Sequence, residues 1–198
     1  MMRTPMLTKV STASVPTEWG TFDCTVFSDG DVEHLAFVRG RPTDPALVRI
    51  HSECLTGDIF GSRRCDCGPQ LATAMQRIVH EGAGVLVYLR GHEGRGIGIG
   101  QKIAAYSLQD DGADTVDANV RLGLPVDARD YGVAAAMLHE LGIGKVRLIT
   151  NNPEKCTALS ERGIEISERV GLPAAVTPEN RRYLRTKRDR LGHLIEGI

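Results

Sequence analysis

Three of the five cysteines in this chain lie in one short stretch, CLTGDIFGSRRCDC, as Cys54, Cys65 and Cys67. Three thiols cannot pair off into disulfides, and closely spaced cysteines in a reducing compartment are more often metal ligands or catalytic groups. Zinc is the natural occupant, because thiolates bind it at about 2.3 Å and a catalytic site keeps three protein ligands and leaves a fourth position for water. The spacing therefore predicts a zinc site that can activate water.

The residues alone leave two other interpretations open. His51 lies three residues before Cys54 and could complete a closed Cys3His site, because structural zinc sites are usually four-coordinate. Alternatively, the three cysteines are buried without a ligand, although the arginines and acids between them make a poor apolar core. The remaining cysteines, Cys24 and Cys156, stand apart and are predicted to be ordinary buried residues.

A glycine-rich segment, LRGHEGRGIGIG (residues 89–100), could bind phosphate. It fits neither GxGxxG nor GxxxxGK[ST], so neither a dinucleotide-binding fold nor a P-loop is supported. What remains is a glycine-rich turn that enters a helix, where free amides and the helix dipole favour an anion. A tight turn without a ligand is the alternative interpretation. His92 in this segment is treated as peripheral.

The first part of the chain reads as strands and the rest as alternating helices and strands. The early apolar and β-branched segments are separated by turn residues and predict consecutive antiparallel strands: TFDCTVFS (21–28), HLAFVRG (34–40) and ALVRIHS (46–52). Apolar residues then recur at helical spacing from Gln70 until Gly82 stops the helix, and GVLVYLRG follows as a buried strand.

The alternation continues to the end of the chain. Further helices are predicted around IAAYSLQDD (103–111), in AAAMLHELGI (134–143) and after TNNPEK, with the strand KVRLIT (145–150) among them. A last helix is expected from Pro178 with Thr177 as its cap, although Asn180 stands where a capping box would have Glu or Gln. This order predicts an α+β (mixed α/β) fold in a single domain over residues 1–198, with a disordered tail over about residues 1–12.

Composition limits the possible partners. The formal net charge is -1 and aromatic residues make up 5% of the chain, which argues against a zinc-stabilised module that binds nucleic acid through SRRCDC. No stretch approaches the roughly 20 apolar residues of a membrane span, and the first residues lack the apolar run of a secretory signal. We expect a soluble, cytoplasmic protein that binds neither nucleic acid nor membrane.

Several motifs together carry a resemblance to a known family. The segments RIHSECLTGDIFGSRRCDCGPQL, EGRGIG, KIAAYSLQDDGADTVDAN, VDARDYG, LITNNPEK and YLRTKRDRLGH resemble GTP cyclohydrolase II in type and order over nearly the whole chain. The resemblance implies one zinc per subunit, held by Cys54, Cys65 and Cys67 with an open position. It also implies Mg²⁺ carried by the triphosphate of GTP, and a homodimer.

The resemblance further implies a reaction. GTP would be hydrolysed to formate, pyrophosphate and 2,5-diamino-6-(5-phosphoribosylamino)pyrimidin-4(3H)-one, the first step of riboflavin biosynthesis. A zinc-bound water, with its pKa lowered to about 7, would supply the nucleophile for C8 of the purine. A relative that stops at the formamidopyrimidine is the closest alternative. Such relatives depart at the family tyrosine, and Tyr106 is present here.

Residue roles carry over by position. Tyr106 matches the tyrosine thought to assist hydrolysis, and Asp127 and Arg129 match the proton acceptor and the nucleophile toward the α-phosphorus. A guanidinium stays protonated and has no acceptor lone pair, so we expect Arg129 to act as a transition-state clamp that Asp127 orients. The expected nucleotide contacts are Arg49, Ile50, His51, Ser52, Glu53, Gln70, Glu93, Gly94, Arg95, Thr115, Thr150 and Lys155.

Several of these assignments have competing explanations. Without the resemblance, Tyr106 reads as a tyrosine of an amphipathic helix that packs its ring inward. Asp127 and Arg129 could equally form an ordinary surface pair, or Asp127 could be an acid at a helix entry.

Glu53 or Gln70 could accept from the guanine edge, because a buried donor left unpaired costs about 1 to 3 kcal/mol. Thr115 and Lys155, taken without the resemblance, are equally well explained as solvated surface residues.

Overall fold

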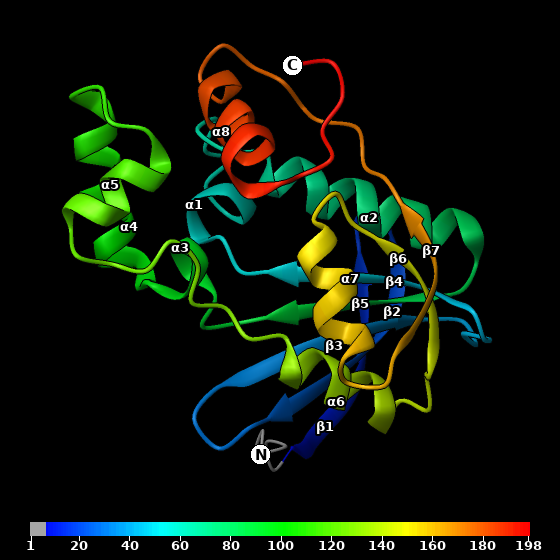
Figure 1. Cartoon of the computed structure of the whole chain (residues 1–198). Coiled ribbons are helices and arrows are strands. Elements are labelled where there is room, and N and C mark those ends of the chain that lie inside the picture. Colours follow the sequence, from blue (N-terminus) through cyan, green and yellow to red (C-terminus); the bar gives the residue numbers. More distant parts are fainter. Residues whose placement is uncertain (1–6) are drawn as a thin grey trace. The chain divides into compact units, whose positions relative to one another are not determined.

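The computed structural model describes residues 7–198, which form two compact units that are each built from three separate stretches of chain (Figure 1). Unit 1 comprises Met1–His51, Ala72–Arg90 and Asp130–Leu172, and unit 2 comprises Ser52–Leu71, Gly91–Arg129 and Pro173–Ile198. The sequence predicts one domain, and it contains no linker that would mark a boundary between the two units. The chain instead passes from one unit into the other several times.

Unit 1 is built on a seven-stranded mixed sheet with the order β1-β2-β3-β5-β4-β6-β7. The strands β1, β2, β3 and β5 pair in antiparallel fashion, whereas β4, β6 and β7 pair in parallel. The strand bounds are Thr8–Thr17, Gly20–Ser28, Glu33–Arg39, Ala46–Ser52, Gly84–Leu89, Lys145–Ile149 and Glu165–Val170 for β1 to β7. The mixed α/β class predicted from the sequence is confirmed.

One predicted strand neighbour was wrong. ALVRIHS forms β4, but β5 lies between β4 and β3, so the three early segments are not consecutive antiparallel neighbours. The reason is burial: β4 is buried at every position except its last, as expected of a central strand covered on both faces. A strand of this kind is placed in the middle of the sheet even when it follows β3 along the chain.

The edge strand β1 was not predicted. Its sequence, TKVSTASVPT, is almost entirely exposed and lacks the apolar alternation that marks a half-buried strand. The expected disordered tail over residues 1–12 falls partly on residues 1–6, which lie outside the described residues. Residues 8–12 belong to β1, which is held by its pairing with β2.

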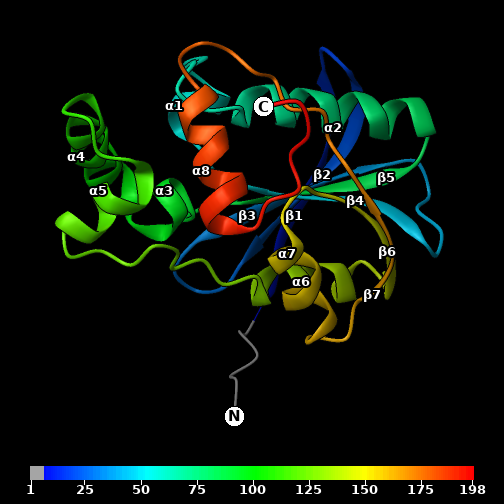
Figure 2. The ribbon, with the colours of Figure 1, turned by 45° about the horizontal axis from the view of Figure 1, so that its top comes forward.

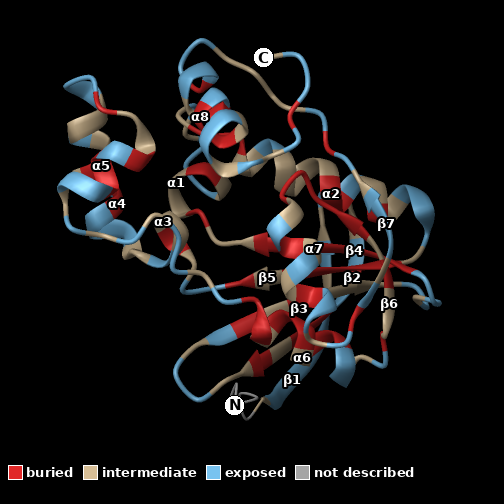
Figure 3. Cartoon of the chain, viewed as in Figure 1, coloured by how far each residue is buried: buried red, intermediate tan, exposed pale blue. Residues whose placement is uncertain are grey.

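Helices cover both faces of this sheet. Figure 2 shows α2 (Cys67–Glu81) along one face and both α6 (Gly132–Glu140) and α7 (Pro153–Ser160) along the other. The main core joins the strands to α6 and α7 through fully buried side chains such as Met137, Leu138 and Leu148. Figure 3 shows in red the buried stretches of the ribbon. This packing fixes the positions of the strand ends within unit 1.

Unit 2 contains short helices around a small core. Its elements are α1 (Leu55–Asp58), the first turn of α2, α3 (Glu93–Gly96), α4 (Gly98–Asp110), α5 (Thr115–Arg121) and α8 (Arg181–Leu191). Ala105, Ala113 and Ala118 form the centre of a buried cluster where α4 and α5 pack together. Asp114 caps α5 by accepting hydrogen bonds from two backbone amides of its first turn.

The last helix starts later than predicted. Thr177 and Asn180 make the reciprocal pair of a capping box, since the Thr177 hydroxyl accepts from Asn180 N and Asn180 Oδ1 accepts from Thr177 N. Asparagine thus fills the place of Glu or Gln, and α8 begins after it at Arg181. In the part of the chain that the structure describes, no helix is long and apolar enough to cross a membrane.

The burial of the core leads to a testable prediction about the free energy of unfolding. Leu148 in β6 is fully buried, so Leu148→Ala should lower the free energy of unfolding by about 2 to 5 kcal/mol through lost transfer energy and the cavity left behind. Denaturant unfolding measures this difference. Val10→Ala, at a site 52% exposed on β1, is the matched control and should stay within about 0.5 kcal/mol of the parent. Equal losses in both variants would contradict this account of the core.

Candidate functional site

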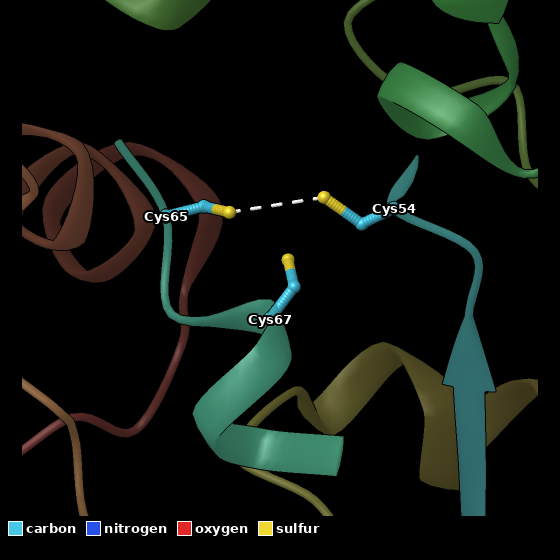
Figure 4. Close-up of side chains that lie close together, drawn as sticks. All are labelled: Cys54, Cys65 and Cys67. Atoms are coloured by element: carbon cyan, nitrogen blue, oxygen red, sulfur yellow. Dashed lines mark hydrogen bonds between the residues drawn. The ribbon is translucent and has the colours of Figure 1, made fainter. Parts of the chain in front are cut away.

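The three predicted cysteines converge in unit 2. Their sulfur atoms lie within 4.8 Å of one another, and Cys54 Sγ is 3.7 Å from Cys65 Sγ. Figure 4 shows Cys67 pointing its sulfur into the space beside the other two. Tetrahedral zinc with bonds of about 2.3 Å places its sulfur ligands about 3.8 Å apart, so the observed spacing fits such an ion. Within residues 7–198 this group contains no histidine, which favours three protein ligands over the closed Cys3His interpretation.

Local backbone brings the thiols together. Cys54 follows β4 and precedes the single turn α1, whose Gly57 and Asp58 amides both donate to the Cys54 carbonyl. Gly57 faces the sulfur atoms directly: a Cβ placed there would lie 2.7 Å from Cys65 Sγ and 3.1 Å from Cys54 Sγ. Because Gly57 has no side chain, the space in which the three sulfur atoms meet stays unfilled. Gly57 is not among the site residues predicted from the sequence.

A buried lysine, also absent from the predicted site, contacts the cysteines. Lys102 Nζ on α4 donates to Cys54 Sγ at 3.1 Å and to Thr56 Oγ1 at 2.9 Å, and forms an ion pair with Glu93. Burial would lower the pKa of Lys102, but its hydrogen bond to Glu93 and the negative charge of Cys54 raise that pKa above its ordinary value. Lys102 thus presents a permanent positive charge to one predicted metal ligand. A lysine inside an amphipathic helix carries no sequence signal for such a role.

The three thiols share one favoured negative charge. Hydrogen bonds from Cys65 and Cys67, with the charge of Lys102, hold the pKa of the Cys54 thiol below its ordinary range. The pKa of Cys65 is raised to about 11, chiefly because its thiol donates to Cys54, and that of Cys67 is also raised. Three thiolates at this spacing require a cation, because like charges this close disfavour one another. The donor set therefore suits a thiophilic divalent metal.

Tyr106 on α4 lies in the same charged neighbourhood. The Arg64 guanidinium stands 4.8 Å from the centre of its ring and Lys102 Nζ stands 5.8 Å from it. Burial raises the pKa of Tyr106 to about 12, against the opposing effects of the Lys102 charge and a hydrogen bond with Thr56. The phenol therefore keeps its proton at neutral pH and can donate a hydrogen bond.

The glycine-rich segment forms a strained turn. Gly94 and Arg95 inside α3 both have left-handed backbone angles, with φ of 60° and 67°. Arg95 is the one non-glycine residue in the described chain with positive φ, a conformation that costs about 1 to 3 kcal/mol and is typical of functional sites. The Arg95 carbonyl accepts from Ala128 N at 3.0 Å. Both terminal nitrogens of Arg95 are buried without a hydrogen-bond partner among residues 7–198, as suits an anion-binding group.

Asp127 and Arg129 form the pair expected from VDARDYG. Arg129 Nε donates to Asp127 Oδ1 at 2.9 Å, and the Arg129 Nη2 group donates to Oδ2. Burial would raise the pKa of Asp127, but these bonds and the charge of Arg95 lower it, so the carboxylate stays ionised. A carboxylate that grips the guanidinium in two places fixes its plane. This geometry agrees with an orienting role for Asp127.

Other predicted contacts within unit 2 have internal partners. Both oxygens of Glu93 are engaged, by Leu55 N at 2.6 Å and by Lys102. Glu53 Oε2 accepts from Gly91 N at 2.7 Å, and Ser52 Oγ lies 3.2 Å from Nδ1 of His92. His92 is therefore tied to a predicted contact residue, although the sequence analysis left it peripheral.

Gln70 and Thr115 occupy separate places in unit 2. Gln70 Nε2 donates to Asp66 Oδ2 at 2.5 Å, so its amide is oriented by a residue between two of the cysteines. Thr115, the first residue of α5, lines a cavity of about 310 Å³ together with Arg64, Tyr183 and neighbouring polar side chains. Thr115 therefore lines a cavity and is not simply a solvated residue on an open surface.

The remaining predicted contacts lie in unit 1. Lys155 is only 6% exposed and donates to the Ile50 carbonyl at 2.8 Å, so the solvated-surface interpretation of this lysine was wrong. Arg49 is also buried and donates to the Ile149 carbonyl at 3.0 Å, while His51 stacks on Tyr88. Thr150 is buried at the end of β6, where its hydroxyl accepts from Asn152 N.

The role of Gly57 can be tested directly. Gly57→Ala should force at least one thiol aside and weaken zinc binding by about 10- to 100-fold, because shifting groups around a metal costs affinity of that order. Competition with a chromophoric chelator measures the change. The matched control is Gly100→Ala on α4, where an added Cβ meets nothing within 4 Å. Unchanged affinity in Gly57→Ala would contradict the packing described for the thiols.

Comparison with known proteins identifies relatives. The chain is 55% identical to riboflavin biosynthesis protein RibBA of Mycobacterium bovis and of Mycobacterium marinum, covering 96% of this chain and 47% of each relative. It is 54% identical to the protein of the same name from Rhodococcus jostii, covering 96% of this chain and 48% of that relative. The chain thus spans about half the length of the curated relatives it matches.

A solved structure, RibBX, a two-domain 3,4-dihydroxy-2-butanone 4-phosphate synthase from A. baumannii, is 22% identical with a TM-score of 0.46. That match covers 84% of this chain and 40% of the other, and it is too weak to support a statement about this protein. The sequence model of one family, described as GTP cyclohydrolase II, matches residues 8–171. This match extends over most of the chain and includes all three converging cysteines. The chain belongs to the GTP cyclohydrolase II family.

Proposed function

We propose that this protein hydrolyses GTP at a zinc centre to formate, pyrophosphate and 2,5-diamino-6-(5-phosphoribosylamino)pyrimidin-4(3H)-one, as the first step of riboflavin biosynthesis. The observation that carries the proposal is the convergence of Cys54, Cys65 and Cys67 in a member of this family. Three sulfur ligands leave one position of a tetrahedral ion open, the arrangement typical of catalytic zinc.

The chain's own residues would prepare the metal site. Zinc, when bound, supplies a Lewis acid that makes water a competent nucleophile near neutral pH. Cys54, Cys65 and Cys67 would hold it, and Lys102 would neutralise part of the thiolate charge through its contact with Cys54 Sγ. Gly57 keeps the space between the sulfur atoms clear.

Cleavage of the triphosphate requires positive charge where negative charge develops. Arg95 offers two buried nitrogens with no hydrogen-bond partner in the described chain, on a turn joined to Ala128. Arg129, held in two places by Asp127, would act as a clamp whose charge does not depend on pH. Together these groups support binding of the phosphates and of the transition state.

Tyr106 supports the complete reaction over the formamidopyrimidine alternative. Its phenol is protonated at neutral pH and lies beside Lys102, so it can donate a hydrogen bond to a departing nitrogen. Relatives that keep the formyl group depart at this position, as the resemblance implies. Formate should therefore be released.

The remaining parts of the proposal rest on the resemblance. We expect Mg²⁺ to accompany the triphosphate and two chains to form a homodimer. Nucleotide contacts are expected from Arg49, Ile50, His51, Thr150 and Lys155 in unit 1. Those expected from unit 2 are Ser52, Glu53, Gln70, Glu93, Gly94, Arg95 and Thr115.

The rival nucleic-acid function gains no support from SRRCDC. Arg63 pairs with Glu179 at 3.1 Å, and Arg64 pairs with Asp110 while donating to the Tyr106 carbonyl. Guanidinium groups matched by carboxylates do not form the unopposed basic patch that phosphate backbones require.

A product assay tests the proposal. Zinc-loaded protein incubated with GTP and Mg²⁺ should yield equal amounts of formate and pyrophosphate, with the pyrimidine product identified by mass. Removal of the metal by a chelator should stop turnover, and Cys65→Ser should do the same, whereas Cys156→Ser in unit 1 should not. A product that retains the formyl group would favour the alternative reaction. Absence of GTP consumption by protein with one zinc per chain would refute the proposal.

The clamp role of Arg129 gives a further expected result. Arg129→Lys keeps the charge but loses the planar fork, so kcat should fall by about 10²- to 10³-fold, as when a single transition-state donor is lost. Steady-state kinetics of pyrophosphate release measures the effect. Arg121→Lys, at an exposed position on α5, is the control. Near-normal turnover in Arg129→Lys would show that the reaction does not need the two-pronged hydrogen bonding of the Arg129 guanidinium.

A further inference from the structure

The residue between two of the cysteines is a buried carboxylate. Asp66 is 1% exposed and directly precedes α2, so its charge is withdrawn from water close to three thiols. An isolated buried carboxylate next to thiolates is strongly unfavourable, because both desolvation and like charges oppose its ionised form. Its presence requires a compensating cation.

That cation comes from the last helix. Lys187 on α8 is 8% exposed and donates from Nζ to Asp66 Oδ1 at 2.9 Å. The other oxygen, Oδ2, accepts from Gln70 Nε2, and the Asp66 carbonyl accepts from Gln70 N at 3.0 Å. Asp66 is therefore held by α8 on one oxygen and by the first turns of α2 on the other.

The helix that carries Lys187 is itself fixed at both ends. The hydrogen-bonded pair of Thr177 and Asn180 closes the turn directly before its first residue, and Gly192 with φ of 63° ends it while His193 N donates to the Lys187 carbonyl. Thr177 Oγ1 also donates to the Arg63 carbonyl at 3.4 Å. The α8 segment thus contacts the stretch around Cys65 and Cys67 at two separate points.

Stability alone gives a weak reason for such a pair. A buried ion pair often contributes no more than two well-packed apolar side chains would, since desolvation of both charges offsets their attraction. The other basic residues of α8 are arginines that are exposed or half-buried. Lys187 is therefore the buried cation of this helix. A directional bond aimed at Asp66 does what an apolar contact cannot: it fixes the orientation of the backbone between Cys65 and Cys67.

We infer that Lys187 is a positioning residue, which through Asp66 sets the geometry of Cys65 and Cys67 as metal ligands. The inference rests on the metal site of the proposed function. It extends that site to α8, which lies beyond the residues 8–171 matched by the family model. Groups that orient ligands in this way typically change metal affinity by about 10- to 100-fold when lost.

A charge-neutral double variant separates positioning from net charge. Asp66→Asn with Lys187→Met removes both charges together, so it leaves no unpaired buried ion and the net charge of the pair is unchanged. We expect zinc and Co²⁺ affinity to fall by about 10- to 100-fold, measured by chelator competition. The d–d bands of the Co²⁺ form should also change, because they report the symmetry of the ligands. Lys187→Arg, which keeps a cationic donor, should retain most of the affinity.

Controls distinguish the possible outcomes. Arg185→Met removes a positive charge from an exposed position of the same helix and should leave affinity and spectrum unchanged. A double variant with the parental spectrum and affinity would overturn the inference, even if its thermal stability falls. Failure of the parent protein to bind zinc or Co²⁺ would instead refute the proposed function itself. The inference is supported if the parent protein binds the metal and the double variant at Asp66 and Lys187 shows both weaker binding and a changed spectrum, while Arg185→Met shows neither.

Discussion

Holding three sulfur atoms within 4.8 Å of one another inside a protein is the constraint on which unit 2 depends. Each thiolate disfavours the next, and burial disfavours all of them, so the surrounding chain must supply both space and positive charge. Gly57 supplies the space because it has no Cβ to meet the sulfur atoms. Lys102 supplies the charge at Cys54, and it is itself balanced by Glu93. The cluster is consequently a set of mutually dependent groups and not three independent ligands.

The same constraint explains why Glu93 and Gln70 make internal contacts. Glu93 uses both carboxylate oxygens to hold Lys102 and the start of α1, and Gln70 orients Asp66. A residue can recur in a family motif because it supports the machinery around a substrate, even when most of its hydrogen-bonding capacity is already used. By contrast, both terminal nitrogens of Arg95 are buried with no hydrogen-bond partner in the described chain, and its backbone is strained. Strain and unmet donors together make Arg95 the strongest candidate in this turn for binding an anion.

Sequence patterns predicted the parts that follow from local rules. Apolar runs placed β2 to β6 and most helices, and cysteine spacing predicted the three thiols that converge, because periodicity and residue type are properties of a few neighbouring residues. The order of β4 and β5 could not be predicted locally, since it depends on which strand is covered on both faces. The exposed strand β1 could not be predicted either, because almost none of its side chains are buried and its sequence therefore has no apolar alternation. Lys102 and Lys187 were missed because an isolated lysine in a helix looks solvated until tertiary contacts bury it.

The two buried lysines of unit 2, Lys102 and Lys187, also suggest why the charges are arranged in pairs. Three thiolates and one divalent cation carry a net charge of -1, and each lysine is matched by its own carboxylate, Glu93 or Asp66. The pairs therefore add no net charge, yet they direct one cation at the sulfur of Cys54 and another at the carboxylate of Asp66, which lies between the other two cysteines. An ion pair of this kind can hold a cysteine in position through its hydrogen bonds. Because the pair has no net charge, it does not change the preference of the three thiolates for a divalent ion. Replacing either pair with apolar side chains could preserve folding, but it would remove the directional bonds that orient the ligands.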